Sequence, residues 1–328
     1  MSETHKNQTI LRQLHSTYTE PPLLEIAMHS TDLAFSKLSS EKNPIFLGME
    51  WETKLPDSYK TQKEIIQEAL KTPIKDYVNY SYGGYPLEMR TIPATALFLK
   101  QALKKYMFDT KLNRHFEEYS AAGIHIHIDK RAFTKETLKK FIIFVCHTSN
   151  KTFIESIGGR PLTNKWCRPA FLNLKFMKDG KTIRGTSMTI CDRLQKSIQE
   201  SEPSGKNVAV NTHTDFKTVE FRIFATQTSE QKVLKNLEFT DALVRYVRTS
   251  TYNKLTPEAF VRWLLPRADL YPYLMQEPVI KKIIEKLPRV KGKTKVMIKY
   301  FVKGKIENAK DFLKKTKTNI TSKKSKVS

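Results

Sequence analysis

Ionisable side chains recur at every second residue in three short segments of this sequence. They are Glu50 and Glu52 in GMEWE, His125, His127 and Asp129 in GIHIHID, and Glu220 and Arg222 in TVEFRIF. Because side chains two residues apart on a strand point to the same face, each segment would present these groups on one side of a sheet. Converging carboxylates repel one another unless a cation lies between them, and hard ions such as Mg²⁺ or Mn²⁺ prefer oxygen ligands. Together the segments favour a divalent metal site suited to nucleotide chemistry.

The two histidines leave a second kind of metal site open. A His-x-His pair on a strand directs two imidazoles the same way, and zinc and iron sites use imidazole ligands. His125 and His127 would then belong to a metal-dependent oxygenase or hydrolase. Any one of the segments, taken alone, is also compatible with an ordinary strand that faces solvent.

Two further segments carry guanidinium groups that could bind an anion. In SYGGYPLEMRTIP, Glu88 and Arg90 follow a glycine turn, and an arginine there suits a carboxylate or a phosphate. In GGRPLTNKWCRPAF, an irregular stretch places three polar side chains near an aromatic ring, namely Arg160, Asn164 and Arg168 around Trp166. A loop of this kind can shape a substrate pocket. The alternatives are a surface ion pair for the first segment and a structural loop for the second.

The two-residue period predicts the strands that would position these groups. It covers residues 44–54 and 121–130, and residues 207–224 read as two strands joined by a turn near Asp215. Each strand is apolar on one face and polar on the other. We therefore expect an α+β fold with a curved, mainly antiparallel sheet, helices on its apolar face and an open active-site face.

Apolar residues at helical spacing predict the helices of this fold. They cover residues 23–38, 64–70, 94–107, 134–153, 230–248 and 257–265. Thr134 and Thr256 are the expected N-caps of the fourth and sixth helices, and the pair Gly158 and Gly159 is expected to close the fourth.

The ends of the chain differ in composition from its middle. We expect a polar, helical N-terminal segment over residues 1–40, a catalytic domain over residues 41–280 and a basic, partly flexible extension over residues 281–328. The extension has 17 Lys and Arg residues against three acidic ones, so it carries +14 of the net charge of +24. Such a segment could contact nucleic acid or another polyanion, or it could serve only as a solubilising tail.

Composition also sets expectations for the compartment. The start of the chain lacks a basic region followed by an apolar stretch, and no window approaches about 18 uninterrupted apolar residues. The three cysteines, Cys146, Cys167 and Cys191, form no CxxC pair, which favours a reducing compartment. We expect a cytoplasmic protein without a membrane partner, in the host cytoplasm if it is viral. The Lys-rich composition suits a phage or a bacterium.

Four motifs, in order, resemble those of the amidoligase family of ATP-dependent carboxylate-amine ligases. GMEWE resembles the family's Gly-x-Glu-x-Glu strand, LEMRTIP its glutamate-bearing segment, GIHIHID its Gly-x-His-x-His strand, and NTHTDFKTVEFRIF its Glu-Phe-Arg strand. RPLTNKWCRPAF is also similar to an arginine-containing loop of the family. The resemblance runs from about Phe46 to Arg245. It implies a fold like the catalytic domains of glutamine synthetase and glutamate-cysteine ligase.

The resemblance also implies a reaction and roles for named residues. ATP would phosphorylate a substrate carboxylate, and an amine would displace phosphate to form an amide. The implied ligands of Mg²⁺ or Mn²⁺ are Glu50, Glu52, Glu88, His125 and Glu220. The implied nucleotide contacts are His125, His127, Arg222 and Arg160, and the implied catalytic residues are Arg222, Glu50 and Arg90. Substrates would be a small-molecule or peptide carboxylate and an amine.

Two other readings compete with the ligase. The first is a nucleic-acid-binding protein that uses the basic extension and has an inactive sheet site. The second is the oxygenase or hydrolase built on a His and Glu metal site.

Overall fold

The computed structural model describes seven stretches of the chain, all between residues 44 and 287. They are residues 44–54, 78–81, 87–91, 93–118, 122–162, 208–212 and 218–287. The helices expected at residues 23–38 and 64–70 and most of the basic extension lie outside them. The chain divides into two compact units, residues 1–256 and 257–328. The division expected at residues 41 and 281 stays a prediction.

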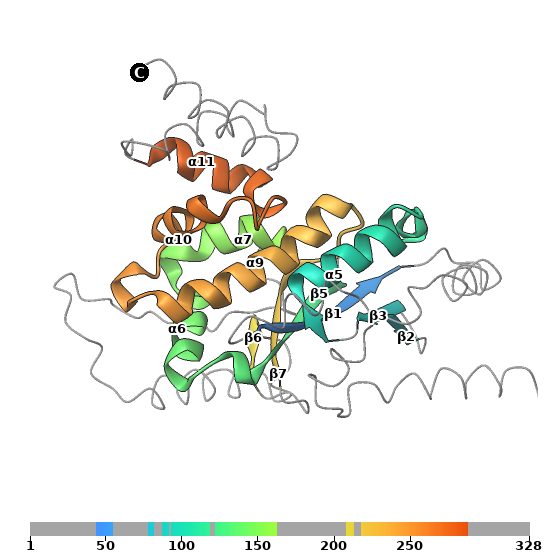
Figure 1. Ribbon diagram of the computed structural model, residues 1–328, viewed down its shortest axis with the longest axis horizontal. Helices are drawn as coiled ribbons and strands as arrows, with labels where there is room; N and C mark the ends of the chain where they lie inside the picture. The colour runs from blue at the N-terminus through green and yellow to red at the C-terminus, as the bar shows by residue number, and fades with distance from the viewer. Residues whose placement is uncertain are drawn as a thin grey trace, which may run out of the picture. The chain divides into compact units, whose positions relative to one another are not determined.

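The first unit is built on an open sheet of seven strands (Figure 1). They are β1 (Phe46–Thr53), β2 (Val78–Ser81), β3 (Leu87–Thr91), β4 (Ala94–Thr95), β5 (Gly123–Asp129), β6 (Val210–Asn211) and β7 (Thr218–Ala225). Their order is β2-β3-β1-β5-β7-β6, and β4 also pairs with β1. All of these pairs are antiparallel. The mainly antiparallel sheet predicted from the alternating pattern is therefore confirmed.

Helices of the first unit follow or separate these strands. The α-helices are α5 (Ala96–Leu103), α6 (Lys135–Cys146), α7 (Lys151–Gly158) and α9 (Glu230–Thr249). The short turns are η3 (Lys104–Phe108), η4 (Leu112–His115), η5 (Lys130–Ala132), η6 (Thr148–Asn150) and η7 (Tyr252–Lys254). In the second unit, α10 (Pro257–Leu264), η8 (Leu265–Arg267), η9 (Leu274–Gln276) and α11 (Pro278–Lys286) follow one another. The protein thus has an α+β fold.

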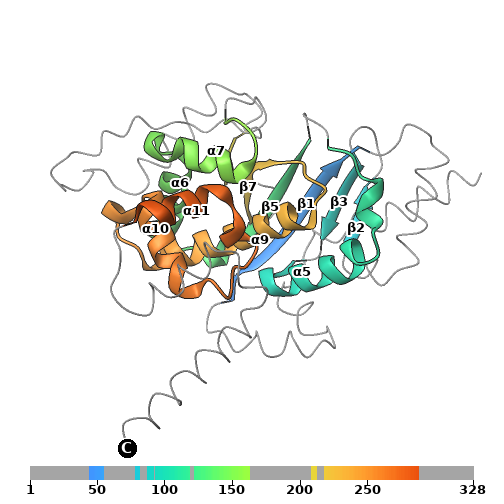
Figure 2. The ribbon, with the colours of Figure 1, turned by 90° about the horizontal axis from the view of Figure 1, so that it is seen from above.

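The apolar face of the sheet packs against helices. Met49 on β1 and Ile126 on β5 have no exposed surface. Phe221 on β7 contacts Phe141 of α6 edge to face at 5.1 Å between ring centroids, and it stacks with Phe239 of α9 at 6.2 Å. α5 and α9 lie over the sheet in both views (Figures 1 and 2). Burial of these rings and aliphatic chains holds the strands in place, so the opposite face is left for polar groups.

The expected helix over residues 134–153 is divided in two. Thr134 caps α6 as predicted, and its hydroxyl accepts a hydrogen bond from Thr137 N. α6 ends at Cys146 because His147 adopts an extended conformation, and α7 begins after the turn η6. The buried amide of Asn150 donates to Phe144 O at 2.9 Å and to Leu255 O at 3.0 Å. This amide satisfies a carbonyl that the interrupted helix leaves open.

Other helix boundaries agree with the pattern or differ by a turn. α9 covers the predicted residues 230–248, and α10 begins at Pro257 as expected. Over residues 94–107, the first two residues form β4, Thr95 caps α5, and the last turns are π-helical.

Among the described residues, no helix is both long and apolar enough to cross a membrane.

Burial of Cys146 gives a prediction about its reactivity. The residue is 3% exposed, and burial raises the pKa of its thiol to about 12. The thiolate is the reactive form, so at pH 8 its population in the folded protein should fall by on the order of 10³. We expect iodoacetamide to modify Cys146 at least about 100-fold more slowly in the folded protein than in the unfolded chain. Peptide mass spectrometry over time measures this, and equal rates with and without denaturant would contradict the buried position.

Candidate active site on the polar face of the sheet

Strand register brings the polar residues of four strands to neighbouring positions. On β1, Glu50 lies opposite Arg90 of β3 on one side and opposite His125 of β5 on the other. His127 lies opposite Glu220 of β7. These residues are far apart in the sequence, and antiparallel pairing places them side by side on one face of the sheet.

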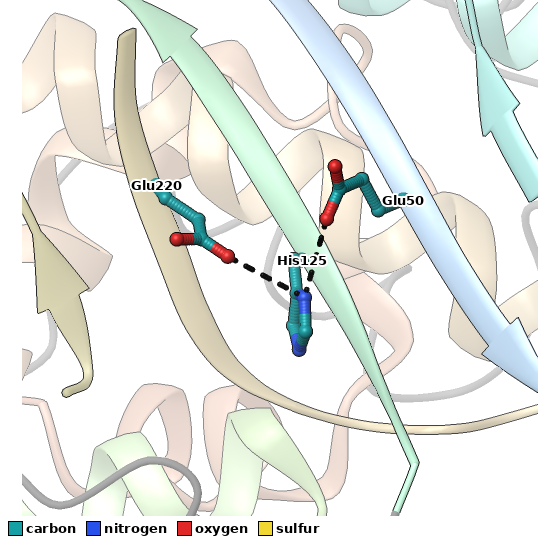
Figure 3. A group of neighbouring side chains, drawn as sticks. All are labelled: Glu50, His125 and Glu220. Carbon is teal, nitrogen blue, oxygen red and sulfur yellow. Dashed lines mark ion pairs between the residues drawn. The ribbon is translucent and has the colours of Figure 1, made fainter. Parts of the chain in front are cut away.

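Two carboxylates and one imidazole form the centre of the site. His125 Nδ1 lies 3.5 Å from Glu50 Oε2 and 3.5 Å from Glu220 Oε1. Figure 3 shows the imidazole on β5 between the carboxylates of β1 and β7, with one ring nitrogen directed at both. One ligand atom from each residue lies within 4.8 Å of the others. Among the described residues, this is the one such group of three, and its two oxygens and one nitrogen fit a divalent cation.

Glu50 also lies close to an arginine and to a second histidine. Its Oε1 atom lies 3.3 Å from Arg90 Nε and 3.3 Å from His127 Nε2, and 12% of its side chain is exposed. Burial acts to raise the pKa of Glu50, but hydrogen bonding to His125 and His127 and their charges lower it well below its usual value. Glu50 is therefore a carboxylate at neutral pH.

His127 supports Glu50 from the next position on the face. Its Nδ1 atom lies 3.0 Å from Thr218 Oγ1, and its Nε2 atom faces Glu50. Burial acts to lower the pKa of His127, but the hydrogen bond to Glu50 and the charges of Glu50 and Glu220 raise it above its usual value. Thr218 was not singled out in the sequence, because a threonine in a strand carries no special signal.

Glu52 and Glu88 share the polar face but lie beside the central group. The Glu52 carboxylate accepts a hydrogen bond from Gly123 N at 2.9 Å and lies 3.9 Å from His125 Nε2. The Glu88 carboxylate pairs with Arg90, and burial together with the charge of Glu50 raises its pKa. Of the four carboxylates and one imidazole expected to bind metal, three groups thus converge and two lie beside them.

Glu220 is oriented from both sides. Its Oε1 atom pairs with Arg222 on the same strand, and its Oε2 atom accepts a hydrogen bond from Asn211 Nδ2 at 3.0 Å. Asn211, on β6, lies opposite Glu220 and is buried. The sequence placed Asn211 in a strand segment, but its neutral side chain gave no reason to assign it to the site.

Arg160 and Asp129, which were also expected near the site, make their described contacts outside the central group. Arg160 is buried, and its guanidinium donates to the backbone carbonyls of Ala122 and Arg222. Asp129, at the end of β5, caps the turn η5 and pairs with Arg131. Asn164, Trp166 and Arg168 lie outside the described residues.

Comparison with known proteins agrees with the resemblance of the motifs. The family model described as "Putative amidoligase enzyme" matches residues 98–244. This stretch includes His125, His127, Glu220 and Arg222, whereas the strands that carry Glu50 and Glu88 precede it. The match supports the amidoligase resemblance and indicates a ligase-type function. No curated protein matches the chain.

The position of Glu50 predicts how its loss affects stability. In metal-free buffer at pH 7, Glu50→Gln should lower the free energy of unfolding by about 2 kcal/mol, because it removes the charge that faces Arg90 and His127. The pKa of Glu50 is held below its usual 4.5, so this stabilisation is present above about pH 4.5 and is lost as the pH falls through the lowered pKa. Urea titrations between pH 3 and 8 measure it.

The control for this experiment is the exposed carboxylate of Glu117. Glu117→Gln should change stability by less than about 0.5 kcal/mol at every pH. A Glu50→Gln variant as stable as the parent at pH 7, or a difference that widens in acid, would contradict the described network.

Proposed function

We propose that the protein is an ATP-dependent carboxylate-amine ligase with a catalytic domain like that of glutamine synthetase. The observation that carries this proposal is the group of Glu50, His125 and Glu220, where two carboxylates face one imidazole nitrogen. Arginines stand at both ends of this group, with Arg90 beside Glu50 and Arg222 beside Glu220. The family match to residues 98–244 supports the ligase class.

The donor atoms of the site fit Mg²⁺ or Mn²⁺. Glu50, His125 and Glu220 would hold the ion, and Glu52 and Glu88 lie beside these three residues on the same face. When bound, the ion would neutralise phosphate oxygens and offset the charge that develops during phosphoryl transfer. Asn211 and Arg222 keep the Glu220 carboxylate in one orientation, and outer contacts of this kind fix metal ligands in place.

The reaction would proceed in two steps on this face. A substrate carboxylate would attack the γ-phosphorus of ATP, giving an acyl phosphate and ADP. An amine would then attack the acyl carbon, lose a proton and expel phosphate, which leaves an amide. Arg222 and Arg90 each have a guanidinium suited to the transferring phosphoryl group or the substrate carboxylate.

The polar face does not favour the oxygenase or hydrolase alternative. That reading needs His125 and His127 to act as paired ligands, but in the structure only His125 lies in the group of three. His127 instead bridges Glu50 and Thr218. The proposal also includes three further expectations. They are a small-molecule or peptide substrate pair, a polyanion contact through residues 281–328 and a cytoplasmic location.

Loss of Arg222 should remove turnover and keep the fold. Arg222→Ala removes positive charge next to Glu220, and loss of such a group slows phosphoryl transfer by on the order of 10² to 10⁵. The assay incubates protein, ATP and Mg²⁺ with pooled carboxylates and amines and follows ADP and amide products. Arg262→Ala, which changes an exposed arginine of α10, is the matched control. No ADP release with any pairing of substrates would refute the ligase proposal.

Metal binding gives a second test that needs no substrate. Mn²⁺ titration followed by electron paramagnetic resonance should give one site. Glu220→Gln should lower the Mn²⁺ affinity of this site by on the order of 100-fold, because a charged carboxylate ligand becomes a neutral amide. Glu117→Gln should bind Mn²⁺ like the parent. Binding unaffected by Glu220→Gln would place any metal elsewhere.

A further inference from the structure

Strand β7 contains an irregularity next to the central group. Between its pairings with Ile126 and Ile124 of β5, β7 advances from Phe221 to Phe224, so it has one residue more than its partner. The extra residue falls in the stretch that holds Arg222, and Ile223 and Phe224 are both fully buried. A bulge of this kind bends a strand and redirects its side chains, and it needs outside contacts to keep one conformation.

The end of helix α7 approaches this bulge closely. A Cβ atom at Gly158 would overlap the backbone carbonyl oxygen of Ile223, so only glycine allows the approach. Gly159 then takes φ 73°, in the left-handed region, and turns the chain back toward the sheet. The fully buried amine of Lys235 donates to Ile157 O and fixes the last turn of the helix.

Arg160 comes directly after this turn and joins two strands. Its guanidinium donates to Ala122 O, just before β5, and to Arg222 O, in the bulge of β7. It lies over Gly123, where an added Cβ would stand 3.1 Å from both terminal nitrogens. Arg160 is 7% exposed, so its guanidinium lies inside the protein. A planar fork with two separate nitrogens can bridge two carbonyls, whereas a lysine amine cannot do so in the same geometry.

We infer that Arg160 is a positioning residue, which holds the β7 bulge against the start of β5 and so sets where Glu220 and Arg222 stand relative to His125. The inference rests on the proposed function, and it differs from the role of nucleotide contact that the family resemblance implies for Arg160. A contact residue would present its guanidinium to the polar face. Here the guanidinium donates to two backbone carbonyls, one in β7 and one just before β5, and these two strands carry Glu220 and His125.

The test measures Mn²⁺ binding to the full chain in the absence of nucleotide. Arg160→Lys keeps the charge but loses the fork, and we expect it to weaken Mn²⁺ binding by about 10- to 100-fold, because outer contacts set the geometry of metal ligands. Arg245→Lys is the matched control, because Arg245 forms a similar forked contact with Asp241 on α9. We expect that control to bind Mn²⁺ like the parent even if its melting temperature falls.

A second variant covers the case in which Arg160→Lys fails to fold. Gly123→Ala keeps Arg160 but introduces the Cβ that crowds its guanidinium, and it should weaken Mn²⁺ binding in the same direction. If Arg160→Lys or Gly123→Ala lowers the melting temperature but leaves Mn²⁺ affinity unchanged, the inference is wrong and the proposed function stands. If Arg160→Lys weakens only ATP binding, Arg160 is a contact residue. If the parent binds no Mn²⁺, the proposed metal site and this inference both fail.

Discussion

Two carboxylates, Glu50 and Glu220, face the same imidazole nitrogen of His125 at 3.5 Å each. Like charges this close in a largely buried place are costly unless cations or hydrogen-bond donors compensate them. The surrounding strands supply that compensation. Arg90 and His127 face Glu50, and Arg222 and Asn211 hold the two oxygens of Glu220. On the polar face, each of these carboxylates is therefore compensated by a nearby cation or hydrogen-bond donor. This compensation requires each strand to keep its register.

The helices on the opposite side of the sheet help to fix this strand register. Phe221 packs between Phe141 and Phe239, while Glu220 and Arg222, its neighbours in sequence, turn to the polar face. A slip of one residue in β7 would exchange these faces and bury charge against the aromatic rings. Packing on one face thus determines the chemistry available on the other.

Much of this arrangement could be predicted from local patterns. Alternation of apolar and ionisable residues identified β1, β5 and β7 and assigned Glu50, His125 and Glu220 to one side. Threonine and glycine signals located the start of α6 and the end of α7. These features depend on residues that are near one another in sequence, and short-range physical rules describe them.

Other features could not be predicted, because they depend on contacts between distant segments. The break between α6 and α7 is stabilised by Asn150, whose amide reaches Leu255 about a hundred residues later. Asn211 and Thr218 enter the site only through strand pairing. From the sequence, Arg160 was expected to bind an anion. An arginine in an irregular stretch gives no sign of the backbone carbonyls that it contacts after folding, so its structural role could not be predicted.

The most direct measurement is a crystal structure of the protein with Mn²⁺ and a non-hydrolysable ATP analogue, with the metal located by its anomalous signal. We predict a Mn²⁺ peak among Glu50, His125 and Glu220, with the triphosphate on the polar face beside Arg222. Metal and nucleotide bound away from this face, with the three side chains still in mutual contact, would contradict this prediction.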